Sequence, residues 1–213
     1  MARLRDFVAG LIGRPSGDRR GRELDPLTGR VAADGALRIG VLVYRGVSSS
    51  EVDEPVARLA DRLQAGVVFV GAAVGPIHAV EPSRAIRVDC TPVDAPHVDV
   101  LVVPGGLGWK QVIDDPATRA WLTTAALEAR GILAISTGSL LLASVGRLEG
   151  RSATGHWLAE DELAALGVNV SSMRTASDDG GRVVTASGAL AAVQVVDGLA
   201  DQARWAEWMP DGS

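Results

Sequence analysis

Residues 131–150, GILAISTGSLLLASVGRLEG, combine a potential nucleophile with the elements that would present it. The run is apolar up to Ile135, small and polar from Ser136 to Ser139, and then apolar again with helical spacing. This pattern predicts a buried strand that ends at Ser136 and a helix that begins immediately afterwards. In open α/β sheets, sites form where strands end and helix N-termini converge. Ser136 is therefore a candidate nucleophile at a strand-to-helix turn.

Ser136 also has a simpler interpretation as the N-cap of the helix that follows it. The motif differs from the G-x-S-x-G turn of α/β-hydrolases, because residue 134 is Ala. A serine hydroxyl is a weak acid and needs a positioned base before it can attack. Other parts of the sequence must therefore decide whether Ser136 is a helix N-cap or a nucleophile.

The remaining sequence predicts alternating strands and helices, which favour a three-layer α/β sandwich around a mostly parallel sheet. Short runs rich in Val, Ile and Leu predict strands, and runs with acidic starts and Gly stops predict helices. The expected strands are 37–44, 67–73, 98–106 with a Gly pair at its end, 132–136 and 182–188. The expected helices are 48–65, ending before Gly66, then 116–130, 137–146 and 188–209.

Composition limits the classes of protein to which this chain could belong. Its 213 residues suffice for one sizeable core, so we expect a single domain at 37–213 preceded by an extension at 1–36. The net charge of −5 gives no electrostatic attraction to nucleic acid, and no apolar run is long enough to span a membrane. A lone cysteine, Cys90, fits a reducing cytoplasm and a structural role. The three histidines lack metal-ligand spacing, so we predict no metal and no cofactor.

Several motifs occur together in an order that is similar to a known family. The segment STGSLLLASVGRLEGRSATGHW resembles the nucleophile region of the ThiJ/PfpI superfamily, within the class I glutamine amidotransferase-like fold. The resemblance is greatest to its isocyanide hydratase and AraC-type regulator branch, and it spans residues 37 to about 208. VLVYRGV is similar to the family's first strand, VDVLVVPGGLG to its Gly-pair loop, and GRVVTASGALAAVQVVDGLA to its closing segment. The resemblance implies a flavodoxin-like sheet in a single domain.

The resemblance also implies roles for individual residues. The family places a cysteine where this chain has Ser136, with an acidic side chain nearby that matches Glu51; Asp53 and Glu54 are competitors. A buried carboxyl group there would act as general acid or base, although all three carboxylates could instead favour a helix N-terminus. Backbone N–H groups of the loop Gly105, Gly106 and Leu107 would form an oxyanion hole with that of Thr137. His156 matches a histidine near the pocket, where it is either a packed residue or a second base.

Two classes of function follow from these residues. The first is a bacterial small-molecule enzyme with isocyanide-hydratase-like lyase or hydrolase chemistry, in which Ser136 occupies the nucleophile position and Glu51 moves the proton. A variant of it is a cyclase or lyase that uses Glu51 without covalent attack. The second is a catalytically silent member that binds a ligand or joins an assembly. If Ser136 instead replaces a native cysteine, the protein is an ordinary cysteine enzyme with the same site. The resemblance implies a homodimer, and the sequence leaves no room for a DNA-binding module.

Overall fold

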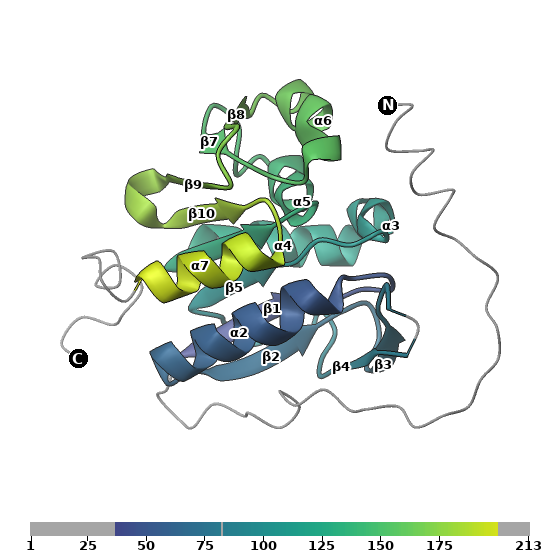
Figure 1. The fold of residues 1–213 in the computed structure, drawn as a ribbon. Helices are drawn as coiled ribbons and strands as arrows, with labels where there is room; N and C mark the ends of the chain where they lie inside the picture. Colours follow the sequence, from purple (N-terminus) through teal and green to yellow (C-terminus); the bar gives the residue numbers. More distant parts are fainter. Residues whose placement is uncertain (1–36, 82, 200–213) are drawn as a thin grey trace.

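The computed structural model describes residues 37–81 and 83–199, and its centre is a six-stranded sheet with the order β2-β1-β5-β6-β10-β9 (Figure 1). Five neighbouring strands run parallel, and β9 pairs with β10 in the antiparallel sense at one edge. The strands of this sheet are β1 (Arg38–Leu42), β2 (Gly66–Val70), β5 (Val100–Val103), β6 (Gly131–Ile135), β9 (Thr175–Asp178) and β10 (Val183–Ala186).

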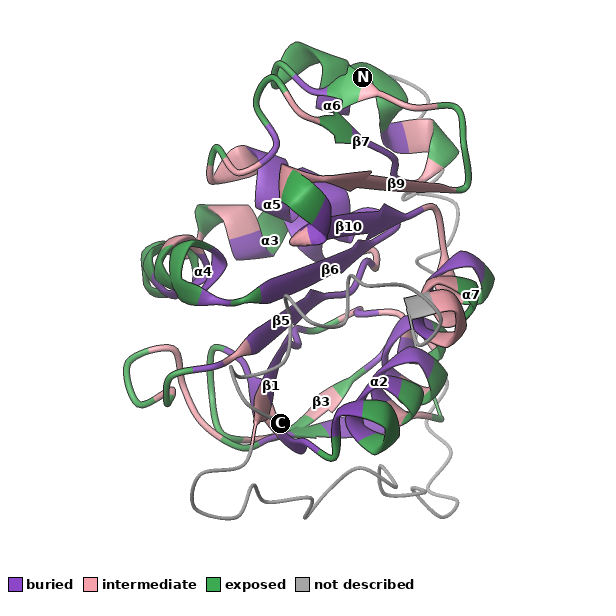
Figure 2. Cartoon of the chain, turned by 90° about the vertical axis from the view of Figure 1, so that its left-hand side faces the viewer, coloured by how far each residue is buried: buried purple, intermediate pink, exposed green. Residues whose placement is uncertain are grey.

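Helices cover both faces of this sheet (Figure 2). On one face lie α2 (Ser49–Leu63) and α7 (Ala189–Leu199), which pack against each other. On the other lie α3 (Trp109–Asp114), α4 (Pro116–Glu128) and α5 (Gly138–Ser144). The predicted three-layer α/β sandwich with a mostly parallel sheet is therefore confirmed.

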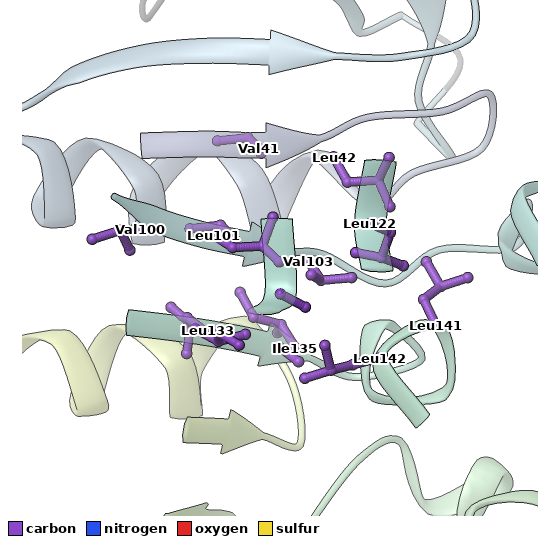
Figure 3. Packing of buried hydrophobic residues seen from close by; sticks show 14 of the residues in the cluster. Val41, Leu42, Val100, Leu101, Val103, Leu122, Leu133, Ile135, Leu141 and Leu142 are labelled. Carbon is purple, nitrogen blue, oxygen red and sulfur yellow. The ribbon is translucent and has the colours of Figure 1, made fainter. Parts of the chain in front are cut away.

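The central strands are apolar along their whole length because helices exclude water from both of their faces. Every residue of β5 and β6 is buried. Val103 and Leu133 belong to the same cluster of buried hydrophobic side chains as Leu122 of α4 and Leu141 of α5 (Figure 3). This explains why these strands are read from the sequence as uninterrupted apolar runs.

The register brings the carboxyl ends of three strands to one edge of the sheet. Val41 of β1 lies opposite Val102 of β5, and Val103 lies opposite Ala134 of β6. Because these strands are parallel and in this register, the residues that follow them lie close together at this edge. Segments 43–51, 104–107 and 136–138 consequently meet at this edge, although they are far apart in the sequence.

Several elements were not predicted, and most of them are short. They are β3 (Gly75–His78), β4 (Ala85–Val88), β7 (Ser152–Ala153), β8 (Asn169–Val170), β9, α3, α6 (Glu160–Ala165) and the 3₁₀ turns 157–159 and 179–181. Helix α2 ends at Leu63, where Gln64 adopts a left-handed backbone with φ of 50°, and Gly66 begins β2 rather than ending the helix. The predicted extension at 1–36 and the last ten residues of the helix expected to reach Met209 lie outside the described residues.

Candidate active site

Ser136 forms a strained turn between β6 and α5, which we call the elbow (residues 136–138). Its φ is 58°, in the left-handed region that costs a residue with a Cβ about 1–2 kcal/mol. The backbone holds it there, because its N–H donates to the Ala186 carbonyl oxygen at 2.7 Å and its carbonyl oxygen accepts from the Ser139 N–H at 3.3 Å. Such strain is characteristic of functional turns, and it points the buried Ser136 side chain toward the edge where the strands end.

Glu51 reaches the elbow from the first turn of α2. Its side chain is buried, its Oε2 accepts a hydrogen bond from the Gly105 N–H at 2.7 Å, and its carboxyl group is hydrogen-bonded to the Ser136 hydroxyl. The two competing carboxylates lie elsewhere: Asp53 pairs with Arg84 and the exposed Glu54 pairs with Arg58. Of the three acidic residues considered from the sequence, only Glu51 contacts Ser136 in the part of the chain that the structure describes.

Burial makes the Glu51 carboxyl group a weaker acid than an ordinary glutamate. Loss of hydration raises its pKa from 4.5 to about 7, hydrogen bonds from Gly105 and Ser136 limit this rise, and the charge of Glu81 adds to it. Glu51 therefore exists in both protonation states near neutral pH. That is the acidity expected of a group that both gives and takes a proton.

The raised pKa of Glu51 predicts a pH dependence of stability. Folded protein keeps this proton between about pH 4.5 and 7, whereas unfolded chain releases it, so the proton stabilises the fold at low pH. We expect the unfolding free energy of the wild type, relative to Glu51→Gln, to fall by on the order of 3 kcal/mol as pH rises through this window. Urea unfolding of both proteins at pH 5, 6, 7 and 8 measures the difference. A constant difference would show that the carboxyl group is ionised throughout.

The loop 104–107, here called the site loop, has its backbone groups tied to three other segments. The Gly105 N–H is bonded to Glu51 and the Gly106 N–H to Thr137 Oγ1 at 2.9 Å, while the Leu107 N–H donates to the Gly46 carbonyl oxygen at 2.8 Å. A Cβ on Gly105 would lie 2.7 Å from the Thr137 nitrogen and 2.9 Å from Glu51 Oε2. Only glycine allows the loop, the elbow and α2 to approach this closely.

These bonds bear on the predicted oxyanion hole. All three site-loop N–H groups already have acceptors, whereas the hydrogen bonds of the described residues include none for the Thr137 N–H. The Gly106 N–H would become free if the Thr137 hydroxyl rotated away. The oxyanion role of Gly105, Gly106 and Leu107 stays a prediction, and Thr137 supplies the amide that is ready to donate.

His156 lies on the segment beside the elbow, where a Cβ on the preceding Gly155 would come within 3.0 Å of the Ser136 carbonyl oxygen. Its Nδ1 accepts from the Leu158 N–H at 3.2 Å, and its ring stacks on Trp157 with centroids 5.8 Å apart. Burial lowers the pKa of His156, which favours the neutral ring. The hydrogen bonds of Ser136 do not include His156. This geometry favours the packing interpretation, and the role of base stays a prediction.

Two further residues next to Glu51 were not singled out from the sequence. Tyr44 is buried just after β1 and its hydroxyl donates to the Pro104 carbonyl oxygen at 3.0 Å, and Glu81 Oε2 accepts from the Ser49 N–H at 3.1 Å. A signal for Tyr44 existed, because it is the only tyrosine of the chain and directly follows a buried strand. Glu81 had none, since its contact is made by a turn that brings distant segments together.

The described residues, 37–81 and 83–199, hold neither a candidate metal site nor a membrane-spanning helix. They contain no group of three or more His, Cys, Asp or Glu side chains arranged to hold a metal ion. They also contain no helix that is long and apolar enough to cross a bilayer.

Comparison with known proteins assigns this chain to a family. The family model described as DJ-1/PfpI family matches residues 37–202. The chain belongs to the DJ-1/PfpI family. An isonitrile hydratase of Pseudomonas putida is 30% identical over 167 residues, which are 78% of this chain and 72% of that protein. The predicted membership of the ThiJ/PfpI superfamily is therefore confirmed.

Solved structures of DJ-1/PfpI proteins agree with the fold. A ThiJ/PfpI family protein from Pseudomonas syringae superposes with a TM-score of 0.70 at 27% identity, covering 89% of this chain and 77% of its own. Toxoplasma gondii DJ-1 superposes with a TM-score of 0.67 at 20% identity, covering 81% and 94% respectively, and shows the fold alone. The predicted flavodoxin-like, single-domain architecture is thus confirmed.

Proposed function

We propose that this DJ-1/PfpI protein is a small-molecule enzyme that adds water to an electrophilic carbon, with an isonitrile as the substrate class. The observation that carries the proposal is the buried Glu51 carboxyl group, hydrogen-bonded to Ser136 and with a pKa raised to about 7. An acid of this strength beside a nucleophile position suits hydration chemistry at neutral pH. The isonitrile hydratase that the chain resembles supplies the substrate class.

Hydration of an isonitrile, R–NC, adds one proton and one oxygen to the same carbon. Protonated Glu51 donates its proton to the terminal carbon, and a water molecule held at Ser136 forms the new C–O bond. The water then gives one proton to the Glu51 carboxylate, which restores the acid. The resulting imidic acid, R–N=CH–OH, tautomerises to the N-substituted formamide, R–NH–CHO. No proton is left over, so Glu51 serves as acid and then as base.

Ser136 can also act as the oxygen nucleophile itself. Glu51 would first give its proton to the isonitrile carbon, and the Ser136 Oγ would then form the C–O bond and pass its own proton to the Glu51 carboxylate, giving an imidate ester, R–N=CH–O–Ser. Water would add to this ester and release the formamide, restoring the serine. The oxygen of the tetrahedral centre would accept a hydrogen bond from the Thr137 N–H. Intact-protein mass spectrometry during turnover distinguishes the two routes, because only the second adds the mass of the isonitrile to the chain.

A second candidate is non-catalytic ligand binding, and one observation favours it. The Gly106 N–H is bonded to Thr137 Oγ1, which leaves fewer free donors at the elbow than an oxyanion hole needs. Incubating the protein with a simple alkyl isonitrile separates the candidates. The enzyme proposal predicts formamide signals in the NMR spectrum above the buffer blank. Saturable binding of the isonitrile without formamide would support the binding role instead.

Replacing Ser136 by cysteine should place a reactive thiol at the elbow. We expect Ser136→Cys, made together with Cys90→Ser, to be alkylated by iodoacetamide at pH 7 roughly tenfold faster or more than Cys90 in the wild type. The thiol would lie before the N-terminus of α5, whereas Cys90 is half-buried and burial beside Asp89 and Asp94 raises its pKa. Peptide mass mapping measures both rates. Equal rates would show that residue 136 is not an accessible nucleophile position.

We further propose that the protein is a homodimer in the bacterial cytoplasm, with a separate N-terminal segment at 1–36. The lone cysteine supports a reducing compartment. Analytical ultracentrifugation tests the assembly, because a dimer has twice the 22.1 kDa mass of the chain and a monomer does not.

A further inference from the structure

Tyr44 is hydrogen-bonded to the site loop through its hydroxyl. Its ring is buried, with 8% of the residue exposed, and its hydroxyl donates to the Pro104 carbonyl oxygen at 3.0 Å. Burial and the nearby Glu51 carboxylate raise the pKa of the phenol, so Tyr44 stays protonated and remains a donor. The ring also lies beside Gly108, one residue past the site loop, since a Cβ on Gly108 would lie 3.1 Å from Tyr44 Cδ2.

The Pro104 carbonyl group and the Gly105 N–H belong to one peptide unit. That N–H donates to Glu51 Oε2 at 2.7 Å, so a single planar amide connects the Tyr44 hydroxyl to the Glu51 carboxyl group. A donor on the carbonyl oxygen polarises the amide and strengthens its N–H as a donor. Since the amide is planar, a bond that fixes the carbonyl also fixes the direction of the N–H.

We infer that Tyr44 is a positioning residue for Glu51, because its hydroxyl holds the Pro104–Gly105 peptide so that the amide N–H stays aimed at the carboxyl group. The inference rests on the proposed role of Glu51 as the acid of the site. Tyr44 does not touch the reacting atoms. Its effect is to stabilise the ionised form of Glu51 and so to set how readily this group releases its proton.

The other groups that face Glu51 come from three elements. Ser136 of the elbow donates to the carboxyl group, Glu81 of the turn after β3 repels its charge, and Gly105 donates from the site loop. On α2 itself, Asp53 is paired with Arg84 and Glu54 with Arg58. Removing the Tyr44 hydroxyl changes none of these groups directly, so a change in Glu51 acidity would report the shared peptide.

Tyr44→Phe removes this hydroxyl and keeps the ring. We expect the pKa of Glu51 to rise by about half a unit, which is roughly a threefold fall in its proton dissociation constant. Infrared difference spectroscopy follows the carboxyl band across pH 5 to 9, with Glu51→Gln in the same background as the blank. Val41→Ala, a buried truncation in β1, is the matched control; it should lower stability and leave the pKa unchanged. No shift in Tyr44→Phe, or equal shifts in both variants, would overturn the inference.

A second measurement keeps the Tyr44 hydroxyl and changes only its strength as a donor. Because the chain has one tyrosine, biosynthetic incorporation of 3-fluorotyrosine alters Tyr44 alone. Fluorine makes the phenol a stronger donor, so the pKa of Glu51 should fall, opposite to its change in Tyr44→Phe. An unchanged or raised pKa would contradict the inference even if the Phe variant failed to fold. These titrations require no turnover, so failure of the hydratase proposal and failure of this inference are separate results.

Discussion

Glu51→Gln will reduce kcat/KM for isonitrile hydration by about 10²–10⁴-fold, the usual contribution of a positioned general acid or base. The amide is nearly isosteric and can still accept the Gly105 hydrogen bond that holds the carboxyl group at 2.7 Å. It has no acidic proton to give to carbon and no basic oxygen able to take one from water. The loss should therefore appear in the chemical step, with the fold intact by circular dichroism. Formamide production followed by NMR gives the rate.

Glu54→Gln is the matched control for this experiment. Glu54 lies on the same helix turn, but it is exposed and pairs with Arg58 on the protein surface. Its loss should change kcat/KM by less than about twofold, because exposed ion pairs contribute little. Should Glu51→Gln keep more than half of the wild-type rate, Glu51 is not the proton carrier.

Gly138→Ala will destabilise the protein by about 3 kcal/mol, the upper range for overpacking in a core. A Cβ at this position would lie 1.9 Å from the Val103 carbonyl oxygen and 2.8 Å from its carbon. Both atoms are backbone of the buried strand β5, so neither can move aside without disrupting the sheet. Helix α5 would have to shift away from β5, and this would displace the elbow. Urea unfolding at pH 7 measures the loss.

Gly188→Ala provides the comparison, because a Cβ there would meet no heavy atom within 4 Å. We expect its unfolding free energy to stay within about 0.5 kcal/mol of the wild-type value. Equal stability of the two variants would mean that α5 and β5 are not packed as closely as described.

The parts of the fold that sequence patterns predicted are those in which one physical requirement dominates. Strands β5 and β6 are buried on both faces, so their apolar runs had only one interpretation. Strand β9 has no fully buried residue, and the two residues each of β7 and β8 pair only with each other. Such elements depend on tertiary pairing rather than on local composition, so no hydrophobic periodicity in the sequence predicts them.

The site was predictable to a similar degree. Ser136 was found because a polar residue interrupts two apolar runs, and Glu51 because spacing and the family resemblance agreed on it. The connections between them depend on backbone groups, which the sequence does not distinguish. For example, the Gly106 N–H is bonded to Thr137 Oγ1, and the Pro104 carbonyl group joins Tyr44 to Glu51 through one peptide. These bonds depend on loop geometry that only a three-dimensional structure provides.

The most direct test of the account is the pH dependence of kcat/KM for a simple alkyl isonitrile between pH 5 and 9, corrected for uncatalysed hydrolysis. A proton donated by Glu51 predicts a plateau at low pH and a tenfold fall for each pH unit above about 7, since that is the pKa of the buried carboxyl group. A rate that is independent of pH, or one that rises with pH through this range, would contradict the account.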